Sequence, residues 1–270
     1  MSNAQYFSYN PGNLPADHFR ISPSQLSRFF DSTSQWYREF LLGEAPAFEG
    51  STASELGTCV HAAAAMYFDT GQVDYSAISA YVSTLPSSID KAEILTQFPL
   101  MVQALITSYL AQNRHTHSEE FVSHEILPSI HVGGSIDSYD SRTGLIVDFK
   151  TTSAKTLPTS FSRTYFFQLL TYAWILRKLG RHVTQLRLVY VSRHIDGGIS
   201  EKTGKPLKSY PPQVSTINHL ITQADWDLIE GCLNLIADSV QTWKSNPELR
   251  YLLCQDYRLK LPPKPLLFKD

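Results

Sequence analysis

An acidic and a basic residue stand two positions apart in the apolar segment Leu145-Ile146-Val147-Asp148-Phe149-Lys150. Successive side chains of a β-strand point to opposite faces, so Leu145, Val147 and Phe149 would share one face and Asp148 and Lys150 the other. Burying these two charges costs desolvation free energy unless a partner, metal or substrate faces them. The alternative is a half-exposed ion pair on a surface strand, which contributes only ~0–1 kcal/mol and has no function.

Asp137 supplies a second carboxylate from the β-branched stretch that precedes this strand. A turn at residues 140–144 would fold the two segments into a hairpin and bring Asp137 towards Asp148. Two converging carboxylates suit Mg²⁺ or Mn²⁺, because these hard cations prefer oxygen ligands. Such a site could polarise a phosphodiester and generate hydroxide from bound water, while Lys150 orients the water or neutralises charge on the phosphate.

The rest of the chain predicts helices, then strands, then a helix, a strand and a helix. Ser22-Pro23-Ser24-Gln25 and Thr52-Ala53-Ser54-Glu55 have the composition of helix starts, and Glu55 is assigned to capping. Three strands are expected from residue 121 onward. The remaining predictions are helices at 76–85, 91–112, 162–179 and from Thr222, a strand at 185–192, a mobile loop at 196–212 and an edge strand at 213–217.

This order of elements predicts an α/β (α+β) fold in which helices flank a central mixed sheet. A chain of 270 residues with 43% hydrophobic content can bury one large core. We expect an irregular arm at residues 1–20, rich in Pro, Gly and Asn, and a single domain at 21–270, with a helical part at 21–118 and the catalytic sheet and helices at 119–270. The formal net charge of −2 indicates that any nucleic acid must be held by a local patch.

Several classes of protein are disfavoured by the composition. The N-terminal residues lack a basic start followed by an apolar run, and no stretch has the ~18 consecutive apolar residues of a membrane span, so we expect a soluble protein inside the cell. The three cysteines, Cys59, Cys232 and Cys254, show no Cys-x-x-Cys spacing. This argues against a disulfide framework and against a structural zinc site.

Four motifs, in the same order along the chain, resemble the RecB-like branch of the PD-(D/E)XK nuclease superfamily. Gly134-Ser135-Ile136-Asp137 and Asp148-Phe149-Lys150-Thr151 are similar to the G-x-x-D…D-x-K-T signature, with Ile136 where the eponymous proline stands. The other three matches are Ser22-Pro23-Ser24-Gln25-Leu26 with the opening helix, Leu56-Gly57-Thr58-Cys59-Val60-His61 with the L-G-T-x-x-H motif, and Gln168-Leu169-Leu170-Thr171-Tyr172 with the Q-x-x-x-Y motif. The resemblance extends from Ser22 to about Tyr190.

The resemblance implies a PD-(D/E)XK core and a role for each matching residue. Asp137 and Asp148 would be metal ligands, His61 an additional ligand and Lys150 the catalytic lysine. Gln168 and Tyr172, four residues apart on one helix face, would contact the substrate or orient the site. Taken alone, these two residues are more often part of a packed core, and His61 is more often a hydrogen-bonded buried histidine.

Glu125 lies on the strand before Asp137, where the family often has a glutamate that would touch a metal through water. His115, His117 and His124 are assigned to a solvated stretch, because one His-x-His is a weak metal signal. Some relatives bind a [4Fe–4S] cluster through one early and three late cysteines. Residues 31–36 of this chain hold no cysteine and only Cys232 and Cys254 lie downstream, so no iron–sulfur cluster is expected.

The expected function is that of a Mg²⁺- or Mn²⁺-dependent DNA nuclease, more specifically an exonuclease in DNA recombination, repair or end processing. Phage and mobile-element recombination modules contain such enzymes, which would place it in the cytoplasm of a bacterial cell or phage-infected host. No G-x-x-x-x-G-K-[ST] motif is present, so a helicase or a single-strand annealing protein would be a separate partner. Ring-shaped relatives make a homo-oligomer a further expectation. The alternative function is that of a catalytically idle nuclease fold serving as a DNA-binding or assembly subunit.

Overall fold

The computed structural model describes residues 6–7, 14–15, 17–44, 50–200 and 202–249. Its centre is a six-stranded mixed sheet in which β1, β3, β4, β5 and β6 follow one another and β2 pairs with β3. Only the β1–β3 and β4–β5 pairs are parallel. The strands are β1 (Phe19–Ile21), β2 (His117–Leu127), β3 (Ile130–Asp140), β4 (Leu145–Thr152), β5 (Gln185–Ser192) and β6 (Val214–Leu220).

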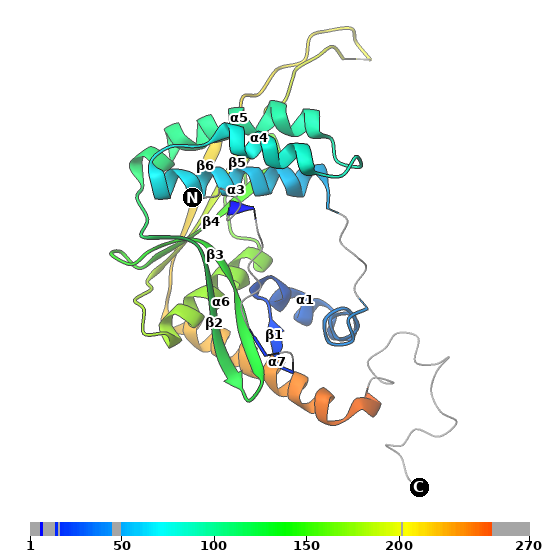
Figure 1. The fold of residues 1–270 in the computed structure, drawn as a ribbon, viewed down its shortest axis with the longest axis vertical. Coiled ribbons are helices and arrows are strands. Elements are labelled where there is room, and N and C mark those ends of the chain that lie inside the picture. Colours follow the sequence, from blue (N-terminus) through cyan, green and yellow to red (C-terminus); the bar gives the residue numbers. More distant parts are fainter. Residues whose placement is uncertain (1–5, 8–13, 16, 45–49, 201, 250–270) are drawn as a thin grey trace, which may run out of the picture.

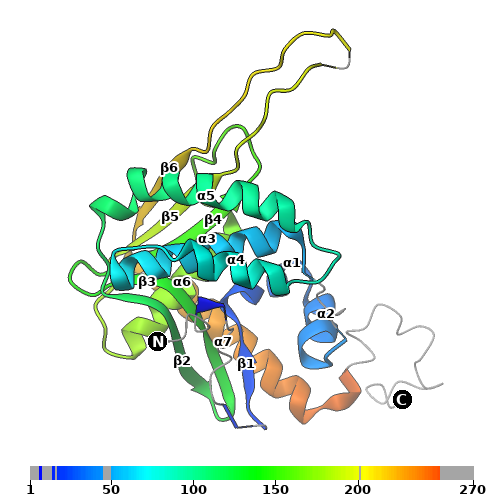
Figure 2. The ribbon, with the colours of Figure 1, turned by 45° about the horizontal axis from the view of Figure 1, so that its top comes forward.

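Helices cover both faces of this sheet (Figure 1). One face carries α3 (Thr52–Thr70), α4 (Tyr75–Thr84) and α5 (Lys91–Ser108). The other carries α6 (Arg163–Lys178) and α7 (Gln223–Ser245), with the short α1 (Leu26–Asp31) and α2 (Thr33–Trp36) beside them (Figure 2). Single turns complete the described elements: η2 (Pro23–Gln25), η3 (Tyr37–Leu41), η4 (Leu110–Gln112) and η5 (Pro247–Leu249).

The alternation predicted for β4 is confirmed. Leu145, Val147 and Phe149 belong to the hydrophobic core formed with α3, α4 and α5, whereas Ile146 belongs to the core on the α6 and α7 side. Asp148 and Lys150 have the same parity as Ile146, so the strand directs them towards α6. The mixed sheet with flanking helices and a helical N-terminal part therefore agrees with the expected fold class.

The helix from Lys91 to Gln112 is, within the described part of the chain, the one helix long and apolar enough to cross a membrane. The apolar character of this helix is explained by the core of the protein, because α5, which makes up most of it, has five buried residues. They pack with α3 and β5 in the same cluster as Phe149. These five core residues are Ile94, Phe98, Met101, Val102 and Leu105.

The start of α3 differs from the prediction. Its N-cap is Ser51, whose hydroxyl accepts the Ser54 N–H at 3.1 Å while the Ser54 hydroxyl accepts the Ser51 N–H at 2.9 Å. Thr52 is thus the first helical residue. Glu55 does not cap the helix, because its carboxylate accepts a hydrogen bond of 2.6 Å from the Tyr81 hydroxyl.

Two segments expected to be irregular contain ordered structure. Phe19 and Arg20, placed in the arm by the sequence, form β1 together with Ile21. Residues 196–212, expected to be a mobile loop, are crossed by the antiparallel bridges Ile195↔Tyr210 and Ile199↔Pro206. Residues 193–200 and 202–212 therefore form a projecting arm, drawn in yellow at the top of Figures 1 and 2.

His115 does not belong to a solvated stretch, as the sequence suggested. Its ring lies 4.5 Å from that of Phe68 and 6.1 Å from that of Tyr109, measured between centroids. Burial lowers the pKa of His115 to about 4, so the imidazole is neutral. It is a partly buried histidine packed against two aromatic rings rather than a solvent-facing one.

Candidate active site

The strands β3 and β4 part at the two aspartates of the motif. Their antiparallel ladder ends with the pair Ser138↔Val147, so Asp137 and Asp148 are the next residues in the register. Instead of pairing with the β3 backbone, the Phe149 N–H donates to Asp137 Oδ2 at 2.8 Å. Both carboxylates consequently lie at an opening in the sheet, which side chains can reach from helices on either face.

His61 reaches this opening from α3. Its Nδ1 lies 3.3 Å from Asp137 Oδ2. Burial by itself would lower the pKa of His61, but the Asp137 carboxylate outweighs burial and raises that pKa to about 9. Burial would raise the pKa of Asp137, yet His61 and Lys150 hold it below its usual value. At neutral pH His61 is therefore a protonated donor to Asp137, and a metal ion binding its Nδ1 would displace that proton.

Asp148 and Lys150 form a buried pair on the opposite side of the opening. The side chain of Asp148 is 4% exposed, and Lys150 Nζ lies 2.7 Å from its Oδ2. Burial is the main cause that raises the pKa of Asp148 to about 6, with Asp137 adding to the rise and Lys150 opposing it. The Lys150 ammonium also lies 4.7 Å from the centroid of the Tyr165 ring. The pair is thus not the half-exposed surface pair that the sequence left open.

Gln168 and Tyr172 come from one face of α6. Gln168 Nε2 donates to Asp148 Oδ1 at 3.4 Å. Tyr172 lies against Gly134, where an added Cβ would meet the tyrosine Oη at 2.9 Å and Pro23 Cδ at 3.1 Å. Burial and the nearby carboxylates raise the pKa of Tyr172, so its hydroxyl remains a proton donor. The glycine of the motif therefore allows α6 and the opening helix to approach β3.

Glu119 is a site residue that the sequence reasoning missed. It lies on β2 between Ser118, paired with Ser138, and Glu120, paired with Ile136, and is therefore opposite Asp137. One carboxylate oxygen of Glu119 lies within 4.8 Å of donor atoms of both His61 and Asp137. Although Glu119 as a residue is exposed, the crowding of its carboxylate by the site, together with the Asp137 charge, raises its pKa to about 7. The position is strained, because its φ of 48° lies in the left-handed region, which costs a non-glycine residue about 1–3 kcal/mol.

Glu125 does not reach this group of residues. It lies six residues further along β2, about 20 Å from Glu119 at ~3.4 Å per residue. Its Oε1 accepts the Ser129 N–H at 2.9 Å and lies 3.9 Å from His131 Nε2. The role of Glu125 as a water-mediated metal contact is therefore not supported by its position, because the residue is near the hairpin tip and not at the opening between β3 and β4.

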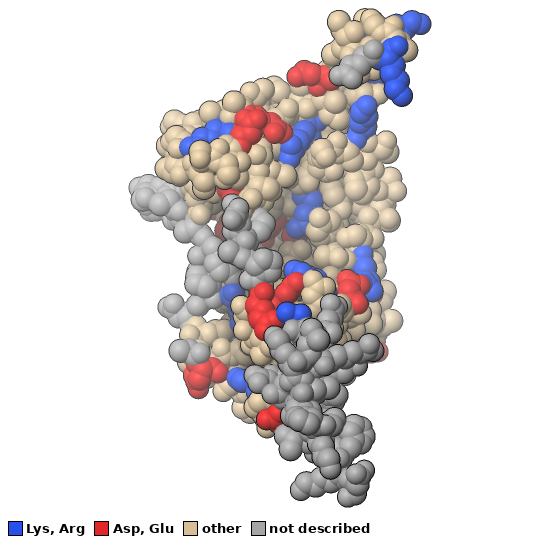
Figure 3. All heavy atoms as spheres, turned by 90° about the vertical axis from the view of Figure 1, so that its right-hand side faces the viewer, with Lys and Arg blue, Asp and Glu red and all other residues tan. Residues whose placement is uncertain are grey.

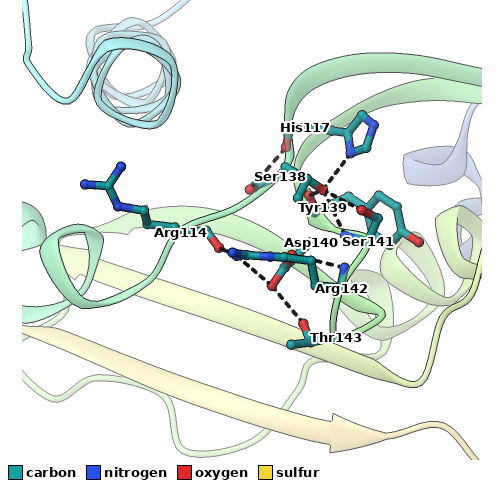
Figure 4. Close-up of polar contacts among 9 residues, drawn as sticks. Arg114, His117, Ser138, Tyr139, Asp140, Ser141, Arg142 and Thr143 are labelled. Atoms are coloured by element: carbon teal, nitrogen blue, oxygen red, sulfur yellow. Dashed lines mark hydrogen bonds and ion pairs between the residues drawn. The ribbon is translucent and has the colours of Figure 1, made fainter.

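A compact turn fixes the register that brings Asp137 and Asp148 opposite one another (Figure 4). Asp140 Oδ1 accepts from the Arg142 N–H at 3.2 Å and from Arg142 Nε at 2.8 Å, and its Oδ2 accepts from the Thr143 hydroxyl at 3.0 Å. The Gly144 N–H donates to the Asp140 carbonyl at 2.9 Å, and the φ of +69° at Gly144 favours glycine. Burial would raise the pKa of the Asp140 carboxyl group, but the hydrogen bonds from Arg142 and Thr143 to its carboxylate lower that pKa below its usual value.

The donor set fits a hard divalent cation. Asp137 and Glu119 supply oxygen atoms and His61 supplies one nitrogen, and these three donor atoms lie within 4.8 Å of one another; the neighbouring Asp148 would add a further oxygen. An oxygen-rich set of this kind suits Mg²⁺ and Mn²⁺. The raised pKa values of Asp148 and Glu119 are partly caused by the neighbouring carboxylate of Asp137, a repulsion that a cation would relieve. A pocket of about 400 Å³ reaches this cluster and is lined by Tyr6, Phe7, Ser54, Glu55, Gly57, Thr58, His61, Tyr81 and Glu119. Figure 3 shows acidic atoms recessed between the upper and lower parts of the molecule.

The chain is distantly similar to several solved structures. A putative exonuclease from Eubacterium rectale has 14% identity and a TM-score of 0.50, over 96% of this chain and 92% of that one. A phage-related exonuclease from Haemophilus somnus 129PT has 13% identity and a TM-score of 0.48, over 84% and 96% of the two chains. An alkaline exonuclease from Laribacter hongkongensis has 11% identity and a TM-score of 0.41, over 96% and 100%. No curated protein matches the chain.

These distant structural similarities do not assign the chain to a family. A match to a family model does. The model of the PD-(D/E)XK nuclease superfamily matches residues 20–254, which include every motif named above. The matched span runs from β1 through the opening helix, the β3–β4 hairpin and α6 to beyond α7. The chain belongs to the PD-(D/E)XK nuclease superfamily.

Proposed function

We propose that this protein is a Mg²⁺- or Mn²⁺-dependent deoxyribonuclease that degrades DNA from an end. The observation that carries the proposal is the convergence, where β3 and β4 part, of a buried Asp148–Lys150 pair with the His61–Asp137 pair. A cluster of charged groups whose pKa values are shifted by burial and by one another, beside a pocket, is typical of sites that bind a charged ligand or substrate. Membership of a nuclease superfamily makes a phosphodiester the first substrate to consider.

Each residue would have a distinct part in hydrolysis. Asp137, Asp148, Glu119 and His61 would hold the metal, which when bound supplies a Lewis acid and lowers the pKa of coordinated water. Lys150 would place its ammonium beside the scissile phosphate and stabilise the charge that develops on the phosphate oxygens. Its contact with Tyr165 fixes the position of that ammonium. Gln168 would orient Asp148 through the hydrogen bond to Oδ1.

Basic residues on the projecting arm support DNA as the substrate. The arm leaves the sheet directly after β5, whose Ser192 pairs with Thr152, two residues beyond the catalytic Lys150. Lys155 and Lys208 both approach the ring of Tyr210, at 5.4 and 5.3 Å from its centroid. Figure 3 shows Lys and Arg atoms on the arm. We infer that the phosphate backbone would lie along this arm, which supplies the local basic patch that a chain of net charge −2 requires.

The arm proposal predicts weaker and less salt-sensitive DNA binding when its lysines are removed. Replacing Lys202, Lys205 and Lys208 with alanine should make the slope of log binding constant against log salt shallower by up to about 2.7, because each lost phosphate contact contributes ~0.9. Hydrolysis of a small chromogenic phosphodiester should remain at the wild-type rate. An unchanged salt slope would contradict a role of the arm in binding DNA.

The decisive experiment uses linear duplex DNA labelled at the 5′ or the 3′ end, together with a covalently closed circular duplex. With Mg²⁺ or Mn²⁺, the wild type should degrade the linear duplex and leave the circle intact, and EDTA should stop the reaction. Cleavage of the circle would replace the exonuclease proposal with an endonuclease. DNA binding without any cleavage, by wild type and Lys150→Ala alike, would favour the idle DNA-binding subunit instead.

A helicase, a single-strand annealing protein and further copies of this chain stay proposed partners. Size-exclusion chromatography with light scattering, with and without linear duplex, tests the proposed homo-oligomer. A monomer under both conditions would exclude a ring that encloses DNA.

A further inference from the structure

A second cluster of metal-ligand side chains lies at the tip of the β2–β3 hairpin, about 20 Å from the candidate active site at ~3.4 Å per strand residue. His18 Nδ1 lies 2.8 Å from His131 Nε2, and Glu125 Oε1 lies 3.9 Å from the same Nε2. All three donor atoms lie within 4.8 Å of one another. We propose that His18, Glu125 and His131 bind a zinc ion that ties the N-terminal strand to this hairpin.

The backbone around the cluster holds its three members in place. His18 immediately precedes β1, and the Phe19 N–H donates to the Ser129 carbonyl at 2.8 Å, so β1 is fixed against the hairpin turn. Glu125 is oriented by the Ser129 N–H, which donates to its Oε1 at 2.9 Å. His131 lies opposite Glu125 in the β2–β3 ladder. Second contacts of this kind orient metal ligands and strengthen metal binding.

The donor chemistry selects zinc over magnesium. Two imidazole nitrogens and one carboxylate are ligands that Zn²⁺ accepts, with an open fourth position for water, whereas Mg²⁺ prefers sites in which most donors are oxygen atoms. Two nitrogens bound to Zn²⁺ at ~2.0–2.1 Å in tetrahedral geometry are separated by about 3.3 Å. His18 and His131 would thus move apart by about half an ångström from their present 2.8 Å contact. The absence of Cys-x-x-Cys spacing excludes only a thiolate site and does not bear on this one.

The burial of the cluster is compatible with reversible binding. The His131 side chain is 13% exposed and that of Glu125 is 51% exposed, so an ion can enter from the solvent side.

The experiment measures zinc stoichiometry and affinity by competition with a chromogenic chelator, using the Asp148→Asn, His131→Ala and His18→Ala variants and the wild type. The candidate active site could also bind zinc, so the expected result is a difference from the wild type. His131→Ala and His18→Ala should each bind one zinc ion fewer per chain than the wild type, or bind one ion at least about tenfold more weakly. His117→Ala is the matched control: it removes a histidine from the same hairpin, outside the cluster, and should bind zinc like the wild type. Zinc should also raise the thermal midpoint of Asp148→Asn more than that of an Asp148→Asn, His131→Ala double variant.

Equal zinc binding by wild type, His131→Ala and His18→Ala would overturn the proposal and leave a histidine pair that shares one hydrogen bond. So would the absence of zinc binding by the wild type. The outcome is separable from the nuclease proposal, because His18 and His131 lie outside the catalytic group. Both variants should keep the wild-type rate of Mg²⁺-dependent DNA cleavage, which also demonstrates that they are folded.

Discussion

Replacing Asp148 with asparagine should raise stability and abolish cleavage at the same time. The carboxylate is 4% exposed, and its pKa of about 6 in the folded protein lies above the ordinary value of 3.8. An aspartate whose pKa is raised on folding destabilises the native state at every pH above its unfolded value. The difference between the two pKa values corresponds to about 3 kcal/mol, taken as an upper limit. Asp148→Asn removes this cost and also removes a ligand of the proposed metal.

The pH dependence of the gain has a defined sign. Below about pH 4 the wild-type carboxyl is protonated in both states, so the variant and the wild type should have similar free energies of unfolding. Between about pH 4 and pH 6 only the native state holds the proton, and the advantage of the variant should grow. Above pH 6 the advantage should be constant at up to about 3 kcal/mol.

The assay is urea unfolding in EDTA at several values of pH from 4 to 8, followed by circular dichroism. Asp140→Asn is the control of opposite sign: the pKa of Asp140 is lowered in the folded protein, so this variant should lose stability at pH 7 and lose less as the pH falls. Mn²⁺ should stabilise the wild type more than Asp148→Asn. No gain at pH 7, or the same gain at pH 4 and pH 7, would refute the reasoning. Wild-type cleavage by Asp148→Asn would refute the assignment of the active site.

Three further substitutions test separate parts of the structure. Lys150→Ala should abolish DNA cleavage while Mn²⁺ calorimetry shows nearly unchanged binding; loss of metal binding would show that the lysine organises the ligands. Gly134→Ala should cost about 1–3 kcal/mol in urea unfolding, because its Cβ would lie 2.9 Å from Tyr172 Oη, and unaltered stability would contradict the close approach. Arg181→Met breaks a two-point ion pair with Glu120, of 2.7 and 2.6 Å, and should cost about 1 kcal/mol at pH 7. That loss should disappear as the pH falls through the lowered pKa of Glu120, and a pH-independent loss would assign it to packing instead.

The sequence alone determined the features that depend on local geometry. The two-residue period of a strand places Asp148 and Lys150 on the face opposite Leu145, Val147 and Phe149, whatever the rest of the chain does. The four-residue spacing of Gln168 and Tyr172 places them on one helix face for the same local reason. The structure has both arrangements, with Phe149 in the core on the α3 side and Gln168 hydrogen-bonded to Asp148.

Only the tertiary structure decided which glutamate joins the aspartates. The β2–β3 hairpin pairs Leu127 with Ile130 at its tip, and continuing that register would bring Glu120 opposite Asp137. A β-bulge between Glu125 and Leu127 adds one residue to β2 and moves the register by one position. Glu119 therefore faces Asp137, and Glu120 pairs with Arg181.

No local sequence pattern predicts this bulge, because it depends on how the two strands pack against the rest of the sheet. The separation of β3 and β4 after Ser138 and Val147 is likewise a property of the assembled sheet. Because the strands separate, the Asp137 carboxylate can accept a hydrogen bond from the Phe149 N–H. His61 and Gln168 can then approach the two aspartates from opposite faces of the sheet. The sequence motifs name His61, Asp137, Asp148 and Lys150, but the long-range pairing of β3 with β2, β1 and β4 brings them together and adds Glu119, which no motif marks.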